Sequence, residues 1–405
     1  MASAFADRLA AAQGGTHALI DLDALASNTQ AVLAHLPDDV GLMGIVKANA
    51  YGHGLIPCAR AVLAAGARWL GVARIEEGLA VREAGIIAPV LVLGPPNHAL
   101  LRPALKAGLA LAVGSRADVT AVARIASEEF GPARVHLKVD TGMRRFGVEP
   151  EQALELARAI VADPRLELEG LFTHFATADE PDSGFLQEQA RRFHRVRHLL
   201  ARDGIIPRVV HQANSAAILR GVVGEADLPG ERLARAGILL YGLPPAATMI
   251  APLGARPVLT LVTRLARVFT VAAGEGISYG HTFVAKQEIR CGLAPVGYGD
   301  GLSRLLSNRG WFVVRGRRCP IRGLVCMDQT VIEVGGASEV EAGERAVVLG
   351  DGQSEDMTVV DVAGLCGTIP YEVVTALATR VARVYLRHGQ PIALSDLAGL
   401  VEDRP

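Results

Sequence analysis

The chain has 405 residues and a formal net charge of −1; half of its residues are hydrophobic and 20% are charged. This composition is typical of a globular protein and excludes an intrinsically disordered chain. The balanced charge argues against nucleic acid or an anionic membrane as the main partner, and every apolar run is shorter than the ~20 residues of a membrane-spanning helix.

The five cysteines limit the possibilities further. Their number is odd, and the sequence has no CxxC spacing. Neither a disulfide framework nor a cysteine-based zinc site is therefore predicted. We expect a cytoplasmic protein without a bound metal.

The first part of the chain alternates between helical patterns and short apolar runs. After an amphipathic helix over 21–36, strands are predicted at 40–46, 69–73, 90–93, 109–113, 135–139, 168–175, 209–214 and, more weakly, within 232–240. Helical spacing separates them at 55–65, 76–84, 97–107, 115–129, 150–162 and 184–203. Unalternating apolar strands between helices indicate a parallel sheet covered on both faces.

Eight such strands fit an N-terminal (β/α)8 TIM-type barrel. A doubly wound open sheet is the alternative, but the GxGxxG fingerprint that usually accompanies it is absent from the sequence. In a (β/α)8 barrel the catalytic residues lie at the carboxyl ends of the strands. The ends of the predicted strands should therefore carry any chemistry.

Those ends are unusually polar. They carry Lys47; Lys138, Asp140 and Arg145; His174; Asn214 and Ser215; and Arg235. Each alone has a simpler interpretation, such as a strand-end salt bridge, a core histidine or a helix N-cap. Five polar strand ends on one face of one barrel instead indicate an active site.

The type of chemistry is suggested by Lys47 and by two late turns. Lys47 ends the buried strand 40–46, where desolvation should lower its pKa and make a neutral amine that can attack an aldehyde. Ser215 with the following helix start, and Gly237-Ile238, supply hydroxyl and backbone N–H donors for a phosphate. A reactive lysine beside a phosphate site suggests pyridoxal 5′-phosphate (PLP) as the cofactor.

The pattern changes in the second part of the chain. Short, β-branched strands are predicted at 258–266, 268–272, 289–295, 311–314, 320–324, 330–334 and 345–349, with glycine-rich turns between them. They indicate a C-terminal, mainly antiparallel β domain. We expect a PLP-binding barrel over 16–250 and the β domain over 251–405, with a helix over 371–386.

Two segments of this β domain are too polar and aromatic for ordinary turns. Tyr279 stands in the segment 276–281, and Met327 and Asp328 stand in the segment 325–329. The simpler interpretations are a surface tyrosine and strand packing.

Taken together, these motifs resemble the alanine racemase family of fold-type III PLP enzymes. The resemblance covers about residues 16–386. The matching segments, in family order, are 46–54, 138–143, 173–179, 214–215, 235–238, 278–280 and 325–329. The resemblance implies a homodimer in which the β domain of one subunit faces the barrel mouth of the other.

The resemblance also implies roles for four residues around the reacting carbon. Lys47 holds PLP and acts as acid and base on one face of the substrate, and the partner subunit's Tyr279 acts on the opposite face. Arg235 hydrogen-bonds the pyridine nitrogen. His174 contacts Tyr279 or supports Arg235.

Other positions are assigned to the phosphate and to the substrate. The phosphate ligands are Tyr51, Ser215, Gly237, Ile238 and Tyr371. Arg145 lies near the phenolic oxygen of PLP and the substrate carboxylate, next to Lys138, which family members often carry as a carbamate. The partner's Met327 and Asp328 line the substrate end, whereas Leu324 departs from the family pattern of an arginine near the substrate opening.

The implied function is PLP-dependent interconversion of L-alanine and D-alanine by two bases, which supplies D-alanine for peptidoglycan. Three alternatives remain open: a broad-specificity amino-acid racemase, a PLP-dependent amino-acid decarboxylase and a non-enzymatic PLP carrier. A decarboxylase of this fold is expected to carry an acidic residue where this chain has Arg235. A carrier leaves Tyr279 and the β domain unexplained.

Overall fold

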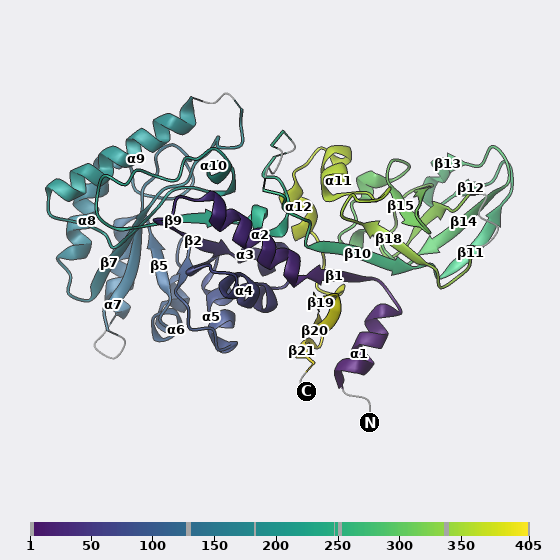
Figure 1. Ribbon diagram of the computed structural model, residues 1–405, viewed down its shortest axis with the longest axis horizontal. Coiled ribbons are helices and arrows are strands. Elements are labelled where there is room, and N and C mark those ends of the chain that lie inside the picture. The colour runs from purple at the N-terminus through teal and green to yellow at the C-terminus, as the bar shows by residue number, and fades with distance from the viewer. Residues whose placement is uncertain are drawn as a thin grey trace.

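A closed barrel of eight parallel strands occupies one end of an elongated molecule, at the left of Figure 1. The computed structural model describes residues 4–126, 131–181, 184–246, 248–249, 253–335 and 340–403. The barrel strands are β2 (Val40–Ile45), β3 (Trp69–Val72), β4 (Val90–Val92), β5 (Ala110–Val113), β6 (Ala133–Lys138), β7 (Leu166–Phe172), β8 (Val209–His211) and β9 (Glu231–Ala236). Parallel pairing of β2 with β9 closes the ring. The predicted (β/α)8 barrel is thus confirmed.

Helices cover the outside of the barrel, as Figure 1 shows. They are α2 (Leu22–His35), α4 (Leu55–Ala64), α5 (Ile75–Glu83), α6 (Leu101–Lys106), α7 (Arg116–Ile125), α8 (Ala153–Val161), α9 (Phe185–Arg202) and α10 (Ser215–Leu219). Side chains cap several N-termini: Asp21 accepts the N–H groups of residues 23 and 24, and Asn214 accepts that of Ala217. Part of the helix predicted over 115–129 lies outside the described residues, which resume at 131.

The other end of the molecule is built from strands. One sheet has the order β16-β15-β18-β10-β1-β19-β20-β21, and all its pairs are antiparallel except β1 with β19. Its members are β1 (His17–Asp21), β10 (Leu259–Arg264), β15 (Trp311–Val314), β16 (Arg317–Pro320), β18 (Arg345–Leu349), β19 (Ala382–Arg387), β20 (Gln390–Asp396) and β21 (Gly399–Glu402). A smaller sheet contains β11 (Arg267–Val271), β14 (Ile289–Ala294) and β17 (Thr330–Glu333), and a short hairpin contains β12 (Gly276–Ile277) and β13 (Phe283–Val284). The predicted antiparallel domain is confirmed.

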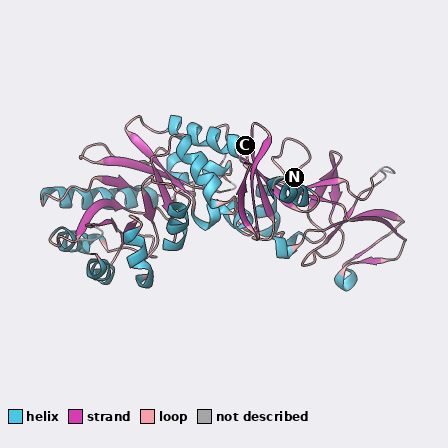
Figure 2. Ribbon diagram, turned by 90° about the horizontal axis from the view of Figure 1, so that it is seen from below, coloured by secondary structure: helices cyan, strands magenta, loops and turns pink. Residues whose placement is uncertain are grey.

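The two ends of the chain meet in the large sheet. β1 pairs with β10 on one side and with β19 on the other, and Figure 2 shows the N and C labels of the chain close together. The helix α1 (Ala4–Gln13) packs its Phe5 beside β19 and β20. The sequence pattern predicted neither β1 nor the hairpins formed by β19, β20 and β21.

The helix predicted over 371–386 is wrong for most of its length. The helix α12 (Pro370–Thr375) is short, and residues 382–387 form β19. The buried side chain of Arg383 explains the break, because its guanidinium donates to the carbonyl oxygens of Leu377, Ala378 and Val381 at 2.6–2.7 Å. These carbonyls are therefore satisfied without a continuing helix, and residues 382–387 pair with β1 and β20 instead.

The strand expected over 320–324 is displaced as well. A tight turn with positive φ at Arg315 (50°) and Gly316 (74°) pairs β15 with residues 317–320, which form β16. The helix α11 (Val359–Cys366) was also not predicted. Among the described residues, no helix has the length and apolarity needed to cross a membrane.

Candidate active site

A cavity of about 360 Å³ opens at the carboxyl ends of the barrel strands. Its lining includes nine of the predicted site residues: Lys47, Tyr51, Lys138, Arg145, His174, Ser215, Arg235, Gly237 and Tyr371. Ile238 follows Gly237 and is fully buried. The fold thus brings together the polar strand ends that the sequence placed on one face of the barrel.

The backbone after Lys47 forms a left-handed turn, α3 (Lys47–Tyr51). Ala48, Asn49 and Ala50 have φ of 53–55° and ψ of 47–52°, and Tyr51 has φ of 52°. Each such residue costs roughly 1–2 kcal/mol relative to a right-handed conformation. Strain of this size persists where the surroundings over-determine the geometry, which is common at functional sites.

Glu77 at the start of α5 is one of the groups that hold this turn. Its carboxylate accepts the N–H of Ala48 at 2.6 Å and those of Ala73 and Arg74, after β3, at 2.7 and 3.1 Å. The end of β3 and the residue after Lys47 are thereby tied to one side chain. The sequence reading missed Glu77, whose only local signal is a carboxylate three residues into a helix.

Lys47 and Lys138 share the cavity with arginine side chains. Burial is the largest cause that lowers the pKa of Lys47, and the charge of Arg145 adds to it. Burial also lowers the pKa of Lys138 to about 8, with repulsion from Arg145 and Arg235. Both amines are therefore easier to deprotonate than an exposed lysine.

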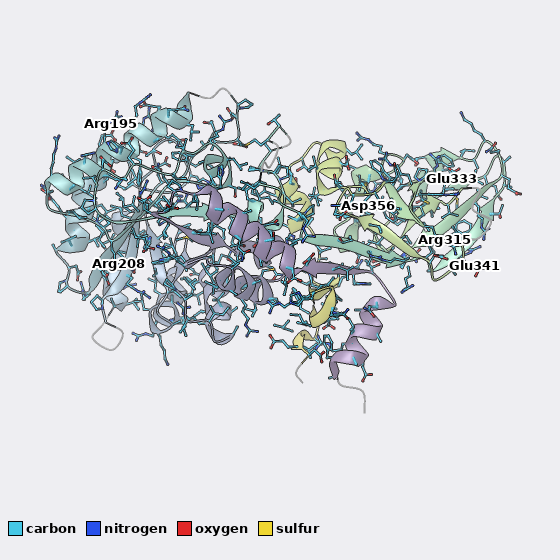
Figure 3. All side chains as sticks on the ribbon, viewed as in Figure 1. Arg195, Arg208, Arg315, Glu333, Glu341 and Asp356 are labelled. Carbon is cyan, nitrogen blue, oxygen red and sulfur yellow. The ribbon has the colours of Figure 1, made fainter. Side chains whose placement is uncertain are left out.

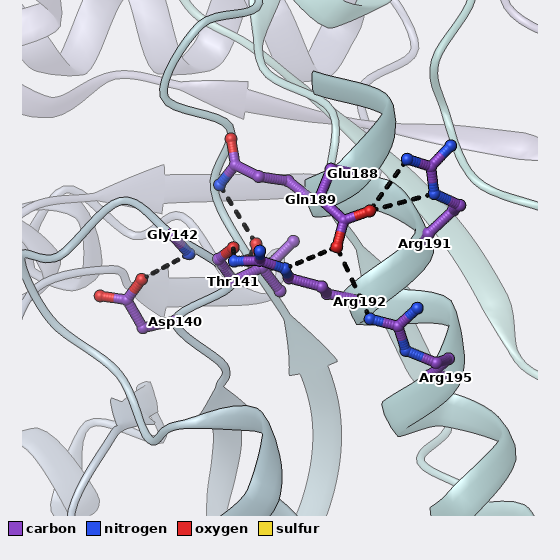
Figure 4. Close-up of polar contacts among 9 residues, drawn as sticks. Asp140, Thr141, Gly142, Glu188, Gln189, Arg191, Arg192 and Arg195 are labelled. Atoms are coloured by element: carbon purple, nitrogen blue, oxygen red, sulfur yellow. Dashed lines mark hydrogen bonds and ion pairs between the residues drawn. The ribbon is translucent and has the colours of Figure 1, made fainter. Parts of the chain in front are cut away.

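Asp140 shapes the loop that carries Arg145. Its carboxylate accepts the N–H groups of Gly142, Arg144 and Arg145 at 2.9–3.1 Å. Figure 4 shows the bond to Gly142 and, beside it, two contacts from α9 to Thr141. The loop after β6 is thus fixed both from within and by the neighbouring helix.

Arg235 is buried at the end of β9 and donates to four acceptors. They are His211 Nδ1 at 2.9 Å, the Thr173 carbonyl at 2.9 Å, His174 Nδ1 at 3.0 Å and the Gln212 carbonyl at 3.1 Å. Burial lowers the pKa of Arg235 to about 9, which still leaves the guanidinium charged at neutral pH. The contact with His174 agrees with the supporting position expected for that histidine.

A buried chain of hydrogen bonds continues from Arg235 through the barrel interior. His211 Nε2 lies 2.9 Å from His136 Nδ1, and His136 Nε2 lies 3.2 Å from Glu169 Oε2. The other oxygen of Glu169 accepts from Arg208, labelled on the barrel in Figure 3. Arginine can only donate, so His211 accepts at Nδ1 and donates from Nε2, and His136 donates in turn to the carboxylate.

Burial keeps both histidines of this chain neutral, because it lowers their pKa values. Burial opposes the charge of Glu169, but hydrogen bonds from His136 and Arg208 still hold its pKa below the usual value. The sequence reading assigned no role to His136, Glu169 or His211. Their only signal in the sequence was a polar residue flanked on both sides by apolar or glycine residues or at the end of an apolar run.

The opposite side of the cavity offers neutral hydrogen-bond donors. Ser215 Oγ accepts the Gly237 N–H at 3.0 Å, and the Tyr51 ring lies 5.9 Å from that of Tyr371. Burial raises the pKa of both phenols, so both keep their protons. A Cβ at Gly237 would lie 2.3 Å from the Tyr51 hydroxyl, so glycine is needed for this close approach.

Tyr279, Met327 and Asp328 are not brought to the barrel cavity of the same chain. They line a second cavity of about 640 Å³ on the C-terminal β domain, together with Ser278, Gly280, His281, Cys326 and Gln329. The side chains of Tyr279 and Met327 are 74% and 53% exposed. Leu324 lies behind this cavity, where its carbonyl accepts from the Ser278 hydroxyl at 2.8 Å.

Comparisons with known proteins match nearly the whole chain. The family models described as "Alanine racemase, N-terminal domain" and "Alanine racemase, C-terminal domain" match residues 20–245 and 258–385. Alanine racemase from Thermobifida fusca is 43% identical over 373 residues, which cover 91% of this chain and 97% of that protein. Alanine racemase from Symbiobacterium thermophilum is 40% identical over 370 residues, with the same coverage.

Solved structures agree with these matches. Alanine racemase from D-cycloserine-producing Streptomyces lavendulae superposes with a TM-score of 0.86 at 38% identity, covering 92% of this chain and 97% of that one. Alanine racemase from Bacillus anthracis with bound L-Ala-P has a TM-score of 0.87 at 34% identity, covering 95% and 98%. With both domain models matched and relatives at about 40% identity across the chain, this protein belongs to the alanine racemase family.

Proposed function

We propose that this protein interconverts L-alanine and D-alanine with PLP as cofactor and so supplies D-alanine for peptidoglycan. The observation that carries the proposal is the cavity at the barrel mouth. It places an amine of lowered pKa, a buried arginine and a set of neutral hydroxyl and N–H donors around one space. Membership of the alanine racemase family supports the same reaction.

The residues of the cavity fit PLP. Lys47 would hold its aldehyde carbon, and Tyr51, Ser215, Gly237 and Tyr371 would hold its phosphate. The protonated phenols and the glycine without a Cβ suit that group. When bound, PLP acidifies the Cα–H of an amino acid by withdrawing electrons from it.

Racemisation requires one group on each face of the substrate carbon, because a single base cannot easily reach both. In our proposal Lys47 removes or returns the proton at Nζ on one face. The partner subunit's Tyr279 does so at its hydroxyl on the other. The lowered pKa of Lys47, caused mainly by burial, makes its amine easier to deprotonate than that of an exposed lysine and so better suited to act as a base.

Arg235 has a different task in this proposal. Its guanidinium is held by His211, His174 and two carbonyl groups, and in bound PLP it would contact the pyridine nitrogen. A group that keeps its proton at neutral pH leaves the nitrogen unprotonated. Arg235 would therefore make bound PLP a weaker electron sink than a carboxylate would, and so limit side reactions such as transamination.

The proposal includes a homodimer with shared active sites. Tyr279 and Met327 are largely exposed on the C-terminal β domain, and the cavity around them is separate from that of Lys47. In a symmetric dimer the same surface of each subunit can complete the other. The exposed Tyr279 would then reach the Lys47 cavity of the partner.

The test is incubation of purified PLP-loaded protein with L-alanine in D2O, with Cα–H exchange, optical rotation and CO2 followed together. We expect exchange and loss of optical rotation at matching rates, without CO2. Exchange with retained optical activity would contradict the second base. Release of CO2 would indicate a decarboxylase, and PLP binding without any exchange of alanine would contradict the assigned substrate.

A further inference from the structure

Two histidines on α9 and one aspartate from the loop between α10 and β9 direct their ligand atoms to one point, away from the PLP cavity. His194 and His198 are four residues apart and so share a face of the helix. Asp227 lies between α10 and β9. One ligand atom from each residue lies within 4.8 Å of the others. The helix α9 runs along the outer surface of the barrel in Figure 1.

The distances show convergence on a single carboxylate oxygen. Asp227 Oδ2 lies 2.7 Å from His198 Nε2 and 3.6 Å from His194 Nε2. The two imidazole rings are 4.3 Å apart between centroids and inclined at 66°. An ordinary hydrogen bond explains the approach of His198, but it does not explain why a second imidazole turns its Nε2 toward the same oxygen.

A second carboxylate stands behind His194. Glu225 Oε2 lies 3.5 Å from His194 Nδ1, the nitrogen that faces away from Asp227. A proton on Nδ1 would leave the Nε2 lone pair directed at the shared point. Histidines that bind metals usually have such a carboxylate or carbonyl on their other nitrogen, which fixes the tautomer.

The neighbouring cations leave this point accessible. Arg191, Arg192 and Arg195 contact Glu188, as Figure 4 shows. Arg197 lies 3.9 Å from Oδ1 of Asp227, so the other carboxylate oxygen faces the histidines. One divalent cation at this point could bind both imidazoles and the carboxylate, because one ligand atom from each lies within 4.8 Å of the others.

We propose that His194, His198 and Asp227 form a binding site for a divalent transition-metal ion, Zn²⁺ in particular. Imidazole nitrogen and carboxylate oxygen are both common Zn²⁺ ligands, at about 2.0–2.2 Å, and three protein ligands leave a fourth position for water. The bound ion holds the segment between α10 and β9 against α9. Its role is structural, and it is independent of the proposed racemase reaction.

The first test is Zn²⁺ binding by the chelator-treated holoenzyme, measured by equilibrium dialysis and metal analysis. We expect about one tightly bound Zn²⁺ per chain, and a rise in Tm of about 2 °C or more at saturation. His194→Gln and His198→Gln should each weaken binding at least tenfold. His98→Gln is the matched control, because His98 also contacts a carboxylate, Asp118 at 3.6 Å, but belongs to no such cluster among the described residues.

A second variant separates metal binding from a folding defect. Glu225→Gln changes a largely exposed side chain and leaves all three ligands in place. It should weaken Zn²⁺ binding by about 10-fold while leaving the metal-free Tm unchanged. The proposal is wrong if the native protein binds Zn²⁺ no more tightly than the His194→Gln/His198→Gln double variant.

Discussion

Lys47, Lys138 and His174 face the same cavity, and all three have a lowered pKa. Burial is the largest cause in each case, and the charges of Arg145 and Arg235 add to it. Among the described residues the lining of this cavity contains no carboxylate. A space bordered by two arginines and two lysines, without a carboxylate among its described lining residues, favours ligands that carry phosphate or carboxylate groups.

Lys138 should make stability depend on pH. Its folded pKa of about 8 lies below the unfolded value of ~10.4. Between these values the unfolded chain binds more protons, so stability rises with pH across this window. From pH 7.5 to 9.5 the free energy of unfolding of the apoprotein should rise by about 2 kcal/mol more than that of Lys138→Met. Urea titrations at both pH values measure this difference, and parallel pH dependence of the two proteins would contradict it.

Tyr279→Phe should leave exchange at one face of the substrate. Removal of a positioned acid or base costs about 10²–10⁴-fold in rate, so racemisation should fall by that factor. PLP absorbance and the retained Lys47 should be unaffected. The measurement is the ratio of Cα–H exchange to racemisation in D2O, with Tyr298→Phe as control because Tyr298 is another exposed tyrosine of the C-terminal β domain. Equal rates for Tyr279→Phe and the native protein would exclude Tyr279 as a base.

At the scale of elements, strands β6 to β9 share one hydrogen-bonded chain. Glu169 on β7 accepts a hydrogen bond from His136 on β6, and His136 in turn accepts from His211, the last residue of β8. His211 accepts from Arg235 on β9. Gly170 makes the crossing possible, because a Cβ there would lie 2.2 Å from His136 Nδ1. The orientation of Arg235 thus depends on a carboxylate deep in the barrel.

Glu169→Gln should destabilise the protein. The substitution removes the charge that accepts from His136 and Arg208, and breaking a buried ionic network costs about 3–5 kcal/mol. We expect a loss of about 3 kcal/mol in the free energy of unfolding, measured with urea. Glu167→Gln is the matched control, because Glu167 lies on the same strand but is exposed. A loss of the same size in both variants would show that the buried chain is not the cause.

At the scale of the whole molecule, the second half of the chain completes the barrel cavity. Tyr371, which lines the cavity, comes from α12. A Cβ at Gly52 would lie 2.1 Å from the Val374 carbonyl oxygen, and a Cβ at Gly54 would lie 1.8 Å from the Tyr385 hydroxyl. The turn after Lys47 is therefore packed against elements more than 300 residues away. A barrel fragment ending at residue 250 would lack this support and Tyr371.

Shared active sites make a prediction about mixed dimers. Lys47→Ala and Tyr279→Phe should each retain at most about 1% of native racemisation alone. In a mixed dimer one cavity combines both defects, whereas the other contains an intact Lys47 and an intact Tyr279. Random pairing makes half the dimers mixed, so co-expression should restore about a quarter of native activity. Activity no higher than in the separate variants would show that each chain builds its own site.

Local patterns in the sequence were sufficient for the barrel and for one side of its cavity. A run of apolar residues indicates a buried strand without any knowledge of its partners, so the eight barrel strands were predicted close to their observed positions. The polar residues at the ends of these strands were identified in the same way. We could identify Lys47, Lys138 and Arg235 as candidate site residues without knowing their contacts. A charged residue at the end of an apolar run can be recognised from the sequence itself.

Tertiary structure decided what depends on partners distant in sequence. The chain from Arg235 to Glu169 requires the register that sets His136 beside Gly170. The turn between α12 and β19 depends on Arg383, which donates hydrogen bonds to the carbonyl oxygens of Leu377 and Ala378. The strand β1 exists because β10 and β19 lie on either side of it. A strand is stabilised by the strands that pair with it, and a buried charge is stabilised by the groups that contact it. In both cases the partners are distant in sequence, so the neighbouring residues do not reveal them.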